Sequence, residues 1–235
     1  MQSRPYVFVN MAMTADGKVD TVERQGARIS GPADTVRVDR LRAESDAVMV
    51  GGRTLLAEDP RLTVRARHLV TERSNAGRPE QPMKVGVVST LEVDALDREG
   101  AFLREGGGRV VLCTSERTGR VAIEQLREAG AEVVVAGAAR VDLAASLAAL
   151  AAMGIERLMV EGGSTLVAGL LEAGLVDELQ LAIAPLLCGG ASAPTPVGGD
   201  GWPRDRALGL QLLESRTSAD GDVVVRYAVG RSAQV

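Results

Sequence analysis

The sequence predicts an α/β protein with a mostly parallel sheet and an antiparallel hairpin at its C-terminal end. Strand-length apolar runs rich in Val, Ile and Leu recur along the 235-residue chain, and helical segments lie between them. Near the C-terminus, two β-rich stretches follow each other without an intervening helix. Alternation of strand and helix is typical of a parallel sheet covered on both faces, and two consecutive strands are typical of a hairpin.

The expected strands show little polar alternation, as strands buried on both faces do. They are Tyr6–Met13, Ala47–Val50, Lys84–Val88, Arg109–Cys113, Glu132–Val135, Arg157–Val160 and Leu179–Ala184. The hairpin is predicted from Leu208–Ser215 and Val223–Val229, joined by a turn that contains Asp220-Gly221-Asp222.

Helices are predicted from capping residues and apolar periodicity. One starts at Pro32 and continues through Asp34–Glu44, one follows Asp142, and one carries Leu166, Leu170 and Leu171 and closes near Gly174. Residues 68–82 and 189–203 are expected to be loops, because they are polar or rich in Gly and Pro.

Composition favours one globular domain over residues 1–235, with two small domains as the alternative. A net charge of -4, a pI near 5.3 and 2% aromatic residues argue against nucleic-acid binding. No apolar run reaches the roughly 18 residues of a membrane span, and no signal peptide is recognisable, so a cytoplasmic location is expected. Cys113 and Cys188 lie far apart, and His68 is expected at the surface, so neither a metal site nor a disulfide is predicted.

The segment Glu161-Gly162-Gly163-Ser164-Thr165 links an expected strand to an expected helix. Such a junction offers free backbone N–H groups and the positive end of a helix dipole to a phosphate. The residues alone leave two interpretations open, since Gly-Gly before a helix also forms a plain βα turn. Glu161 is a candidate functional carboxylate or a simple strand-end cap.

Two further polar clusters occur, one after an apolar strand and one that begins within an apolar strand. After Gly51-Gly52 come Thr54 and then Arg61 and Arg65, whose guanidinium groups suit a phosphate. Taken by itself, this stretch favours the alternative of a capped helix with exposed arginines. Asn10 lies inside an apolar strand, so its amide needs hydrogen-bond partners from the protein or from a ligand.

Together these clusters resemble the pyrimidine reductase family of riboflavin biosynthesis. The shared pattern consists of Thr14-x-Asp16-Gly17-Lys18, the run from Thr54 to Arg65, Val160-Glu161-Gly162-Gly163, and Leu175-Val176-Asp177-Glu178 leading to Ala184-Pro185. The resemblance covers about Pro5 to Gly190. It implies a dihydrofolate-reductase-like three-layer α/β/α fold, a homodimer, and NADPH as hydride donor for reducing a ribosylamino-pyrimidine 5′-phosphate to its ribitylamino form.

By position in the family pattern, the implied NADPH contacts are Thr54, Glu58, Ser89, Gly162, Gly163, Ser164 and Thr165. The implied substrate contacts are Asn10, Arg42, Leu62, Arg65 and Glu161, with the two arginines holding the phosphate. We hypothesise that Glu161 orients the opened sugar and relays a proton during hydride transfer.

The chain departs from the family pattern at two of these positions. Glu58 stands where the family has Asp, and Asn10 stands where bifunctional bacterial relatives have Lys. Asn10 suggests the diaminopyrimidinone rather than the uracil as substrate. The zinc deaminase signature of the bifunctional enzymes is not found in this sequence, so reduction without deamination is expected. A pterin or dihydrofolate reductase of the same fold, or a non-catalytic nucleotide-binding module, is the alternative.

Overall fold

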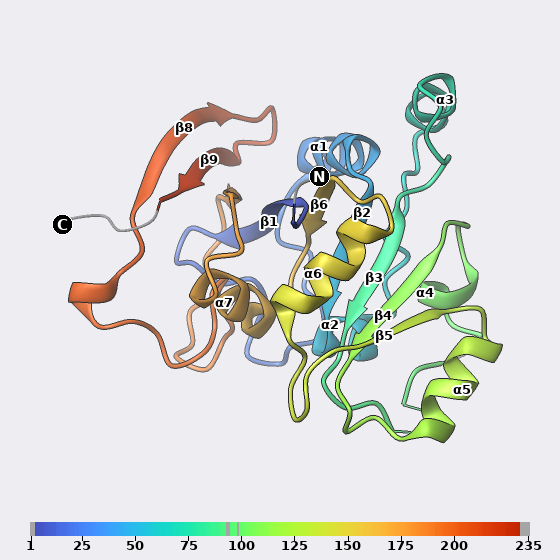
Figure 1. The fold of residues 1–235 in the computed structure, drawn as a ribbon. Helices are drawn as coiled ribbons and strands as arrows, with labels where there is room; N and C mark the ends of the chain where they lie inside the picture. Colours follow the sequence, from blue (N-terminus) through green and yellow to red (C-terminus); the bar gives the residue numbers. More distant parts are fainter. Residues whose placement is uncertain (1–2, 93–94, 98, 231–235) are drawn as a thin grey trace. The chain divides into compact units, whose positions relative to one another are not determined.

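The computed structural model describes residues 3–92, 95–97 and 99–230 (Figure 1). The chain divides into two compact units, which are taken in turn. Unit 1 comprises Met1–Pro5 and Asp39–Met159, and unit 2 comprises Tyr6–Val38 and Val160–Val235. The expectation of one domain over the whole chain stays a prediction.

Unit 1 is built on parallel strands. Its sheet order is β5 (Glu132–Val135), β4 (Val110–Thr114), β3 (Met83–Val87) and β2 (Ala47–Gly51), followed by β6 (Arg157–Val160), which crosses into unit 2. β2 to β5 pair in parallel, with Ala47 beside Met83 and Val85 beside Val111. The helices of this unit are α2 (Gly52–Glu58), α3 (Arg67–Asn75), α4 (Ala101–Arg104), α5 (Arg120–Glu128) and α6 (Leu143–Ala152).

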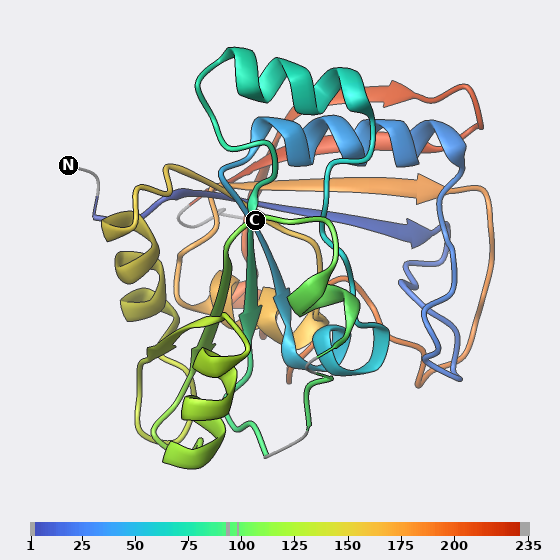
Figure 2. The same cartoon turned by 90° about the vertical axis from the view of Figure 1, so that its right-hand side faces the viewer.

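Unit 2 contains the other sheet strands and two helices. β1 (Tyr6–Thr14) and β7 (Glu178–Ala184) run parallel side by side (Figure 2), and β9 (Val223–Val229) pairs antiparallel with β7. β8 (Leu210–Thr217) completes the hairpin with β9. The helices are α7 (Ser164–Glu172) and the first part of α1 (Pro32–Glu44), with a 3-10 turn at Arg204–Arg206.

The hairpin turn is tied to the beginning of α1. Asp220 accepts a hydrogen bond from the backbone N–H of Ala33, and Asp222 accepts one from Gly31. Pro32 opens the helix, where its missing N–H costs no hydrogen bond. The C-terminal hairpin therefore fixes the N-terminal end of α1.

The predicted strands and the C-terminal hairpin are confirmed with bounds shifted by no more than two residues. The predicted helix starts at Pro32 and after Asp142 are also confirmed, and the Asp142 side chain accepts a hydrogen bond from the N–H of Ala145. Residues 189–203 form no helix or strand, as expected.

The prediction of a loop over residues 68–82 is wrong in its first half, because Arg67–Asn75 form α3. Its polar residues suggested a loop, yet Leu69 is buried and packs with Ala43 and Val64. Arg73 is buried too, and its guanidinium donates to the carbonyls of Ala43, Ser45 and Pro79. A helix with one narrow buried stripe lacks the broad apolar face that sequence periodicity detects.

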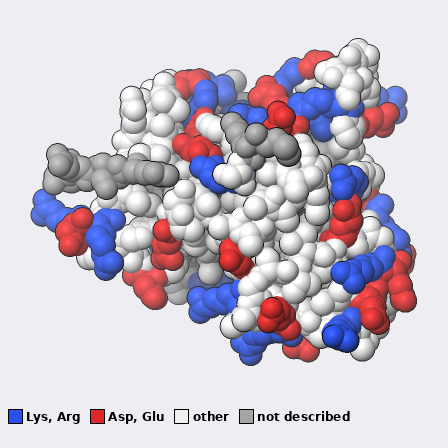
Figure 3. Space-filling view, in the orientation of Figure 1, with Lys and Arg blue, Asp and Glu red and all other residues white. Residues whose placement is uncertain are grey.

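Charges of both signs are interspersed on the face drawn in Figure 3. In the part of the chain that the structure describes, no helix has the length and apolar character needed to span a bilayer.

Candidate functional site

The glycine pair that follows β6 has a backbone conformation that favours glycine. Gly162 has φ +141° and Gly163 has φ +87°, in a region where other residues are strained. A Cβ added to Gly162 would meet only the Met11 Cε atom within 4 Å, at 3.9 Å. Gly162 is buried, yet the space that its Cβ would occupy holds almost no other atom.

Helix α7 begins directly after this turn, and its first residue already has a protein partner. The Ser164 hydroxyl donates to the carbonyl oxygen of Thr195 at 2.5 Å, and the N–H of Gly198 donates to the Ser164 carbonyl. Thr165 is exposed. The Ser164 hydroxyl is therefore already engaged, and its backbone N–H at the start of α7 is the group suited to a ligand.

Two polar side chains of unit 2 belong to the candidate site. Glu161 is half-buried at the carboxyl end of β6, immediately before Gly162. Asn10 on β1 is 5% exposed, and its Oδ1 atom is buried without a hydrogen-bond partner among the described residues. An unmade hydrogen bond of this kind costs about 1–3 kcal/mol. Such an atom is suited to a partner that the protein alone does not supply.

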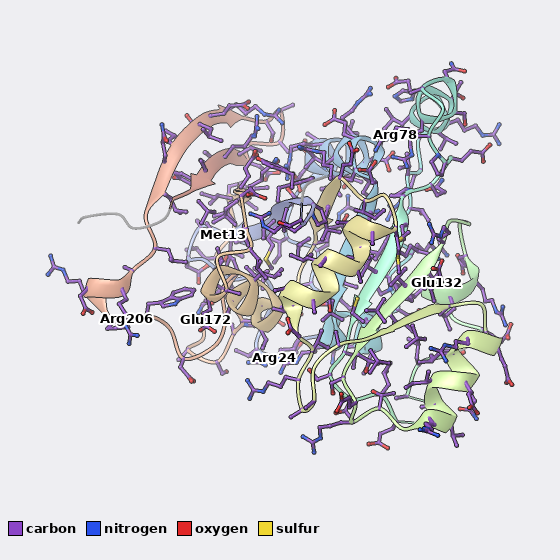
Figure 4. All side chains as sticks on the ribbon, viewed as in Figure 1. Met13, Arg24, Arg78, Glu132, Glu172 and Arg206 are labelled. Carbon is purple, nitrogen blue, oxygen red and sulfur yellow. The ribbon has the colours of Figure 1, made fainter. Side chains whose placement is uncertain are left out.

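The Asp16-Gly17 turn does more than reverse the chain. The Asp16 carboxylate accepts hydrogen bonds from the Thr14 hydroxyl at 2.6 Å and from the N–H groups of Cys188 and Gly189 at 3.2 and 2.7 Å. The bond from Thr14 contributes most to lowering the pKa of Asp16 to about 2. Arg24, labelled in Figure 4, donates to the carbonyl of Ser192. These contacts anchor the loop after β7 to the segment after β1.

In unit 1, two expected cofactor segments lie at one edge of the parallel strands. α2, with half-buried Thr54 and exposed Glu58, follows β2, and Ser89 follows β3. A Cβ on Gly52 would lie 3.1 Å from the Val88 side chain, so the two segments are in contact. The Ser89 hydroxyl accepts a hydrogen bond from the N–H of Val141 at 3.2 Å.

The segment after α2 is held in an uncommon backbone shape. Asp59 and Leu62 have φ values of +43° and +50°. The Asp59 carboxylate accepts hydrogen bonds from the N–H groups of Ala101 and Phe102 at 2.5 and 2.9 Å, so it caps α4. Sequence analysis missed this role of Asp59, although the Asp-Pro pair within the motif was a signal of a fixed turn.

The structure brings three expected substrate residues of unit 1 together. Arg42 donates to the carbonyl of Thr63 at 3.0 Å. In the sequence, Thr63 lies between Leu62, which is 2% exposed, and Arg65. Asp39 accepts the N–H groups of Arg65 and Ala66 at 2.7 and 2.8 Å. The Arg65 side chain is exposed. The last turns of α1 therefore hold the segment that carries Leu62 and Arg65.

Lys84 is a buried cation that sequence analysis did not single out. It is 1% exposed, donates to the carbonyl of Glu105 at 3.0 Å and lies 5.7 Å from the ring centre of Phe102. Burial lowers its pKa. Since Asp59 caps the start of α4 and Lys84 contacts its end, both residues support the same short helix.

Neither cysteine nor histidine contributes an obvious site. Cys113 is buried and burial raises its pKa to about 11, whereas His68 is exposed on α3. Over residues 3–92, 95–97 and 99–230, no cluster of three or more His, Cys, Asp or Glu side chains is placed to hold a metal ion.

Solved structures define the class of this fold. A pyrimidine reductase-like protein from Corynebacterium diphtheriae aligns with a TM-score of 0.78 at 22% identity, covering 97% of this chain and 93% of the other. RibD from Acinetobacter baumannii aligns at 0.76 and 25% identity, covering 97% of this chain and 59% of that one. The fold is that of the dihydrofolate-reductase-like pyrimidine reductases.

Sequence comparisons then give the family. The model described as RibD C-terminal domain matches residues 5–224. A reductase from Methanothermobacter thermautotrophicus is 43% identical over 229 residues, covering 96% of this chain and 99% of the relative. One from Archaeoglobus fulgidus is 41% identical over 199 residues, covering 85% and 89%. The chain belongs to the RibD C-terminal domain family, as its motifs predict, and is an oxidoreductase of riboflavin biosynthesis. Membership implies a nicotinamide cofactor.

Proposed function

We propose that this chain is an NADPH-dependent reductase of the diamino form of the ribosylamino-pyrimidinone 5′-phosphate. The glycine turn at residues 162 and 163 carries the proposal, because it precedes a helix and leaves space free at the Cβ position of Gly162. Both relatives at 41 and 43% identity are named for reduction of 2,5-diamino-6-ribosylamino-4(3H)-pyrimidinone 5′-phosphate.

The residues present fit a dinucleotide phosphate. A Cβ at Gly162 would occupy space that the turn leaves free, and the first N–H groups of α7 have no acceptor within the helix. We assign Gly162, Gly163, Ser164 and Thr165 to the cofactor, together with Thr54, Glu58 and Ser89 of unit 1. When bound, NADPH supplies a hydride to C1′ of the opened sugar.

We assign binding of the substrate phosphate to Arg42 and Arg65. Arg42 is half-buried and already fixed through Thr63, and the exposed Arg65 guanidinium presents a planar donor set. The buried Leu62, in the same segment as Arg65, is assigned an apolar contact. This assignment predicts that the arginines contribute mainly to substrate affinity.

Glu161 is assigned to the reacting end of the substrate. Its carboxyl group orients the opened sugar and supplies the proton that balances hydride addition at the neighbouring nitrogen or oxygen. A half-buried position at a strand end keeps the group fixed while proton exchange with solvent remains possible.

Asn10 supports the diamino substrate. Deamination replaces an exocyclic amino group, a hydrogen-bond donor, with a carbonyl, an acceptor. Lysine at this position offers only donors, whereas an asparagine amide also offers an acceptor. The unsatisfied Oδ1 atom of Asn10 therefore matches an amino group on the ring.

The resemblance also implies a homodimer, and the cytoplasmic location stays a prediction. β8 lies at one edge of the sheet and carries the exposed Leu210, Leu212 and Leu213. Sedimentation over a range of concentrations tests the dimer, and a monomer at every concentration contradicts it.

The test of function is NADPH oxidation measured with the diamino substrate and with its deaminated counterpart in parallel. The proposal predicts turnover of the diamino form with a ribitylamino product. Turnover of dihydrofolate and of neither pyrimidine would favour the alternative of a pterin or dihydrofolate reductase. NADPH binding without turnover of any of these compounds would favour the non-catalytic module.

A further inference from the structure

A row of buried and half-buried polar side chains lies along unit 2, on strands β1, β7 and β9 and the start of α1. Its members are Tyr6, Asn10, Asp34, Arg37, Glu178, Gln180 and Arg226. Residues in register on neighbouring strands project to the same face, and Asn10, Gln180 and Arg226 are in register. The row is therefore one connected layer.

Most of this row is fixed by strong hydrogen bonds. Arg226 donates to both carboxylate oxygens of Glu178 at 2.7 and 3.1 Å, and Tyr6 donates to the same group at 2.8 Å. Burial alone would raise the pKa of Glu178, but these bonds hold it below its ordinary value. Glu178 is therefore a fixed anionic acceptor.

The amide of Gln180 is consequently held in one orientation. Its Nε2 atom donates to Glu178 at 2.7 Å, and its Oε1 atom accepts from Arg37 at 3.3 Å. Arg37 is in turn held by Asp34, whose carboxylate lies 2.7 Å from the Arg37 Nε atom. The Gln180 amide therefore cannot rotate to present its oxygen to another group without losing these two hydrogen bonds.

Two complementary atoms remain beside Gln180. In the described part of the chain, Asn10 Oδ1 and Arg37 Nη2 are both buried and both without a hydrogen-bond partner. Asn10 stands opposite Gln180 on a strand about 4.8 Å away, and Arg37 is bonded to the Gln180 side chain. One atom accepts and the other donates, so a side-chain rotation that pairs them removes two unsatisfied groups at once.

We propose that the Arg37 guanidinium holds Asn10 Oδ1 and thereby fixes the orientation of the Asn10 amide for substrate selection. The inference rests on the proposed contact between Asn10 and the pyrimidine. Arg37 is a positioning residue here, since it acts through Asn10.

The chemical consequence concerns specificity. A free primary amide rotates to present either its oxygen or its NH₂ group, so it matches the diamino ring and the deaminated ring alike. A guanidinium is a donor only, so it pairs with one lone pair of the amide oxygen and excludes the reversed orientation. The second lone pair of Oδ1 is then directed to an amino group on the ring. Discrimination between the two rings therefore requires Arg37 as well as Asn10.

The test compares kcat/KM for the two pyrimidine phosphates. Because Arg37→Met alone leaves the Asp34 carboxylate buried and unpaired, the variant is the double substitution Asp34→Asn with Arg37→Met. We expect the ratio of the two kcat/KM values to fall at least about tenfold toward one, with NADPH affinity unchanged. Arg37→Lys, which retains donors and charge, should restore part of the ratio.

Two backgrounds complete the design. Arg40→Met removes an exposed arginine of the same helix and should leave the ratio at its wild-type value. In Asn10→Leu, the Asp34/Arg37 substitution should no longer change the ratio, because its effect passes through Asn10. An unchanged ratio in the double variant, or an equal effect in the Asn10→Leu background, overturns the proposal.

Failure of the proposed function has a separate signature. If the wild-type chain reduces neither pyrimidine, the urea midpoints of the same variants still report the pair. Non-additive midpoints for Arg37 and Asn10 support their contact, and additive midpoints overturn it.

Discussion

The two regions assigned to the candidate site are supported in opposite ways. In unit 1, side chains hold the backbone within residues 59–66. Asp39 accepts hydrogen bonds from the N–H groups of Arg65 and Ala66, and the Gln81 amide makes two hydrogen bonds to the backbone of Val64. In unit 2, the Cβ position of Gly162 has only the Met11 side chain within 4 Å. Unit 1 fixes the segment that carries side chains we assign to the substrate, whereas unit 2 places the start of α7 at the turn that we assign to the cofactor. Substitutions should therefore affect substrate affinity and stability in unit 1 and chemistry and cofactor affinity in unit 2.

The largest effect is expected at Glu161, beside the open turn. Glu161→Gln should lower kcat about a hundred- to ten-thousand-fold, because a positioned proton donor is lost, while NADPH affinity stays near wild type. Single-turnover kinetics and cofactor titration check both parts. Near-normal turnover would remove Glu161 from the mechanism.

Gly162→Ala should weaken NADPH binding at least about tenfold, because its Cβ enters the path of the phosphate at a strained φ. Gly174→Ala is the matched control, since Gly174 also has a positive φ and open space for a Cβ. Isothermal titration distinguishes them. Equal losses in both variants would show that backbone strain alone is responsible.

Arg65→Ala should raise the substrate KM about 10- to 100-fold with a smaller change in kcat, because it removes charge-assisted hydrogen bonds to the phosphate. Arg40→Ala, which removes another exposed arginine, serves as the control. A KM that matches the control would refute the phosphate role.

Asp59→Ala should cost about 0.5–2 kcal/mol of unfolding free energy by uncapping α4. Asp142→Ala removes the cap of α6 and should cost a similar amount. Urea denaturation measures stability, and KM values measure the site. Only Asp59→Ala should also raise KM, and equal KM values would place Asp59 outside the support of the unit 1 site.

The smallest effect concerns acid stability. The folded pKa of Asp16 is about 2 against an ordinary value of 3.8, so its contribution is full above 3.8 and is lost as the pH falls toward 2. Asp16→Asn should flatten the pH dependence of the urea midpoint in that window. An unchanged slope would show that Asp16 does not anchor the loop after β7.

The sequence predicts strands and the glycine turn well, because apolar runs and paired glycines act locally. The helix α3 was missed, since its buried stripe is narrow and includes Arg73. Hydrogen bonds between residues far apart in the sequence could not be predicted either. Asp39 bonds residues 26 and 27 positions away, and Gln81 bonds one 17 positions away. Such pairs arise from chain folding, and no local pattern marks them.

The proposed reaction is hydride transfer from NADPH to the sugar carbon of the diaminopyrimidinone phosphate. The most direct measurement uses NADPH deuterated at the transferred position and mass spectrometry of the pyrimidine product. The account predicts a ribitylamino product that carries the deuterium at C1′. Recovery of only the unlabelled ribosylamino compound, after incubation with enzyme and saturating cofactor, would contradict the proposed hydride transfer.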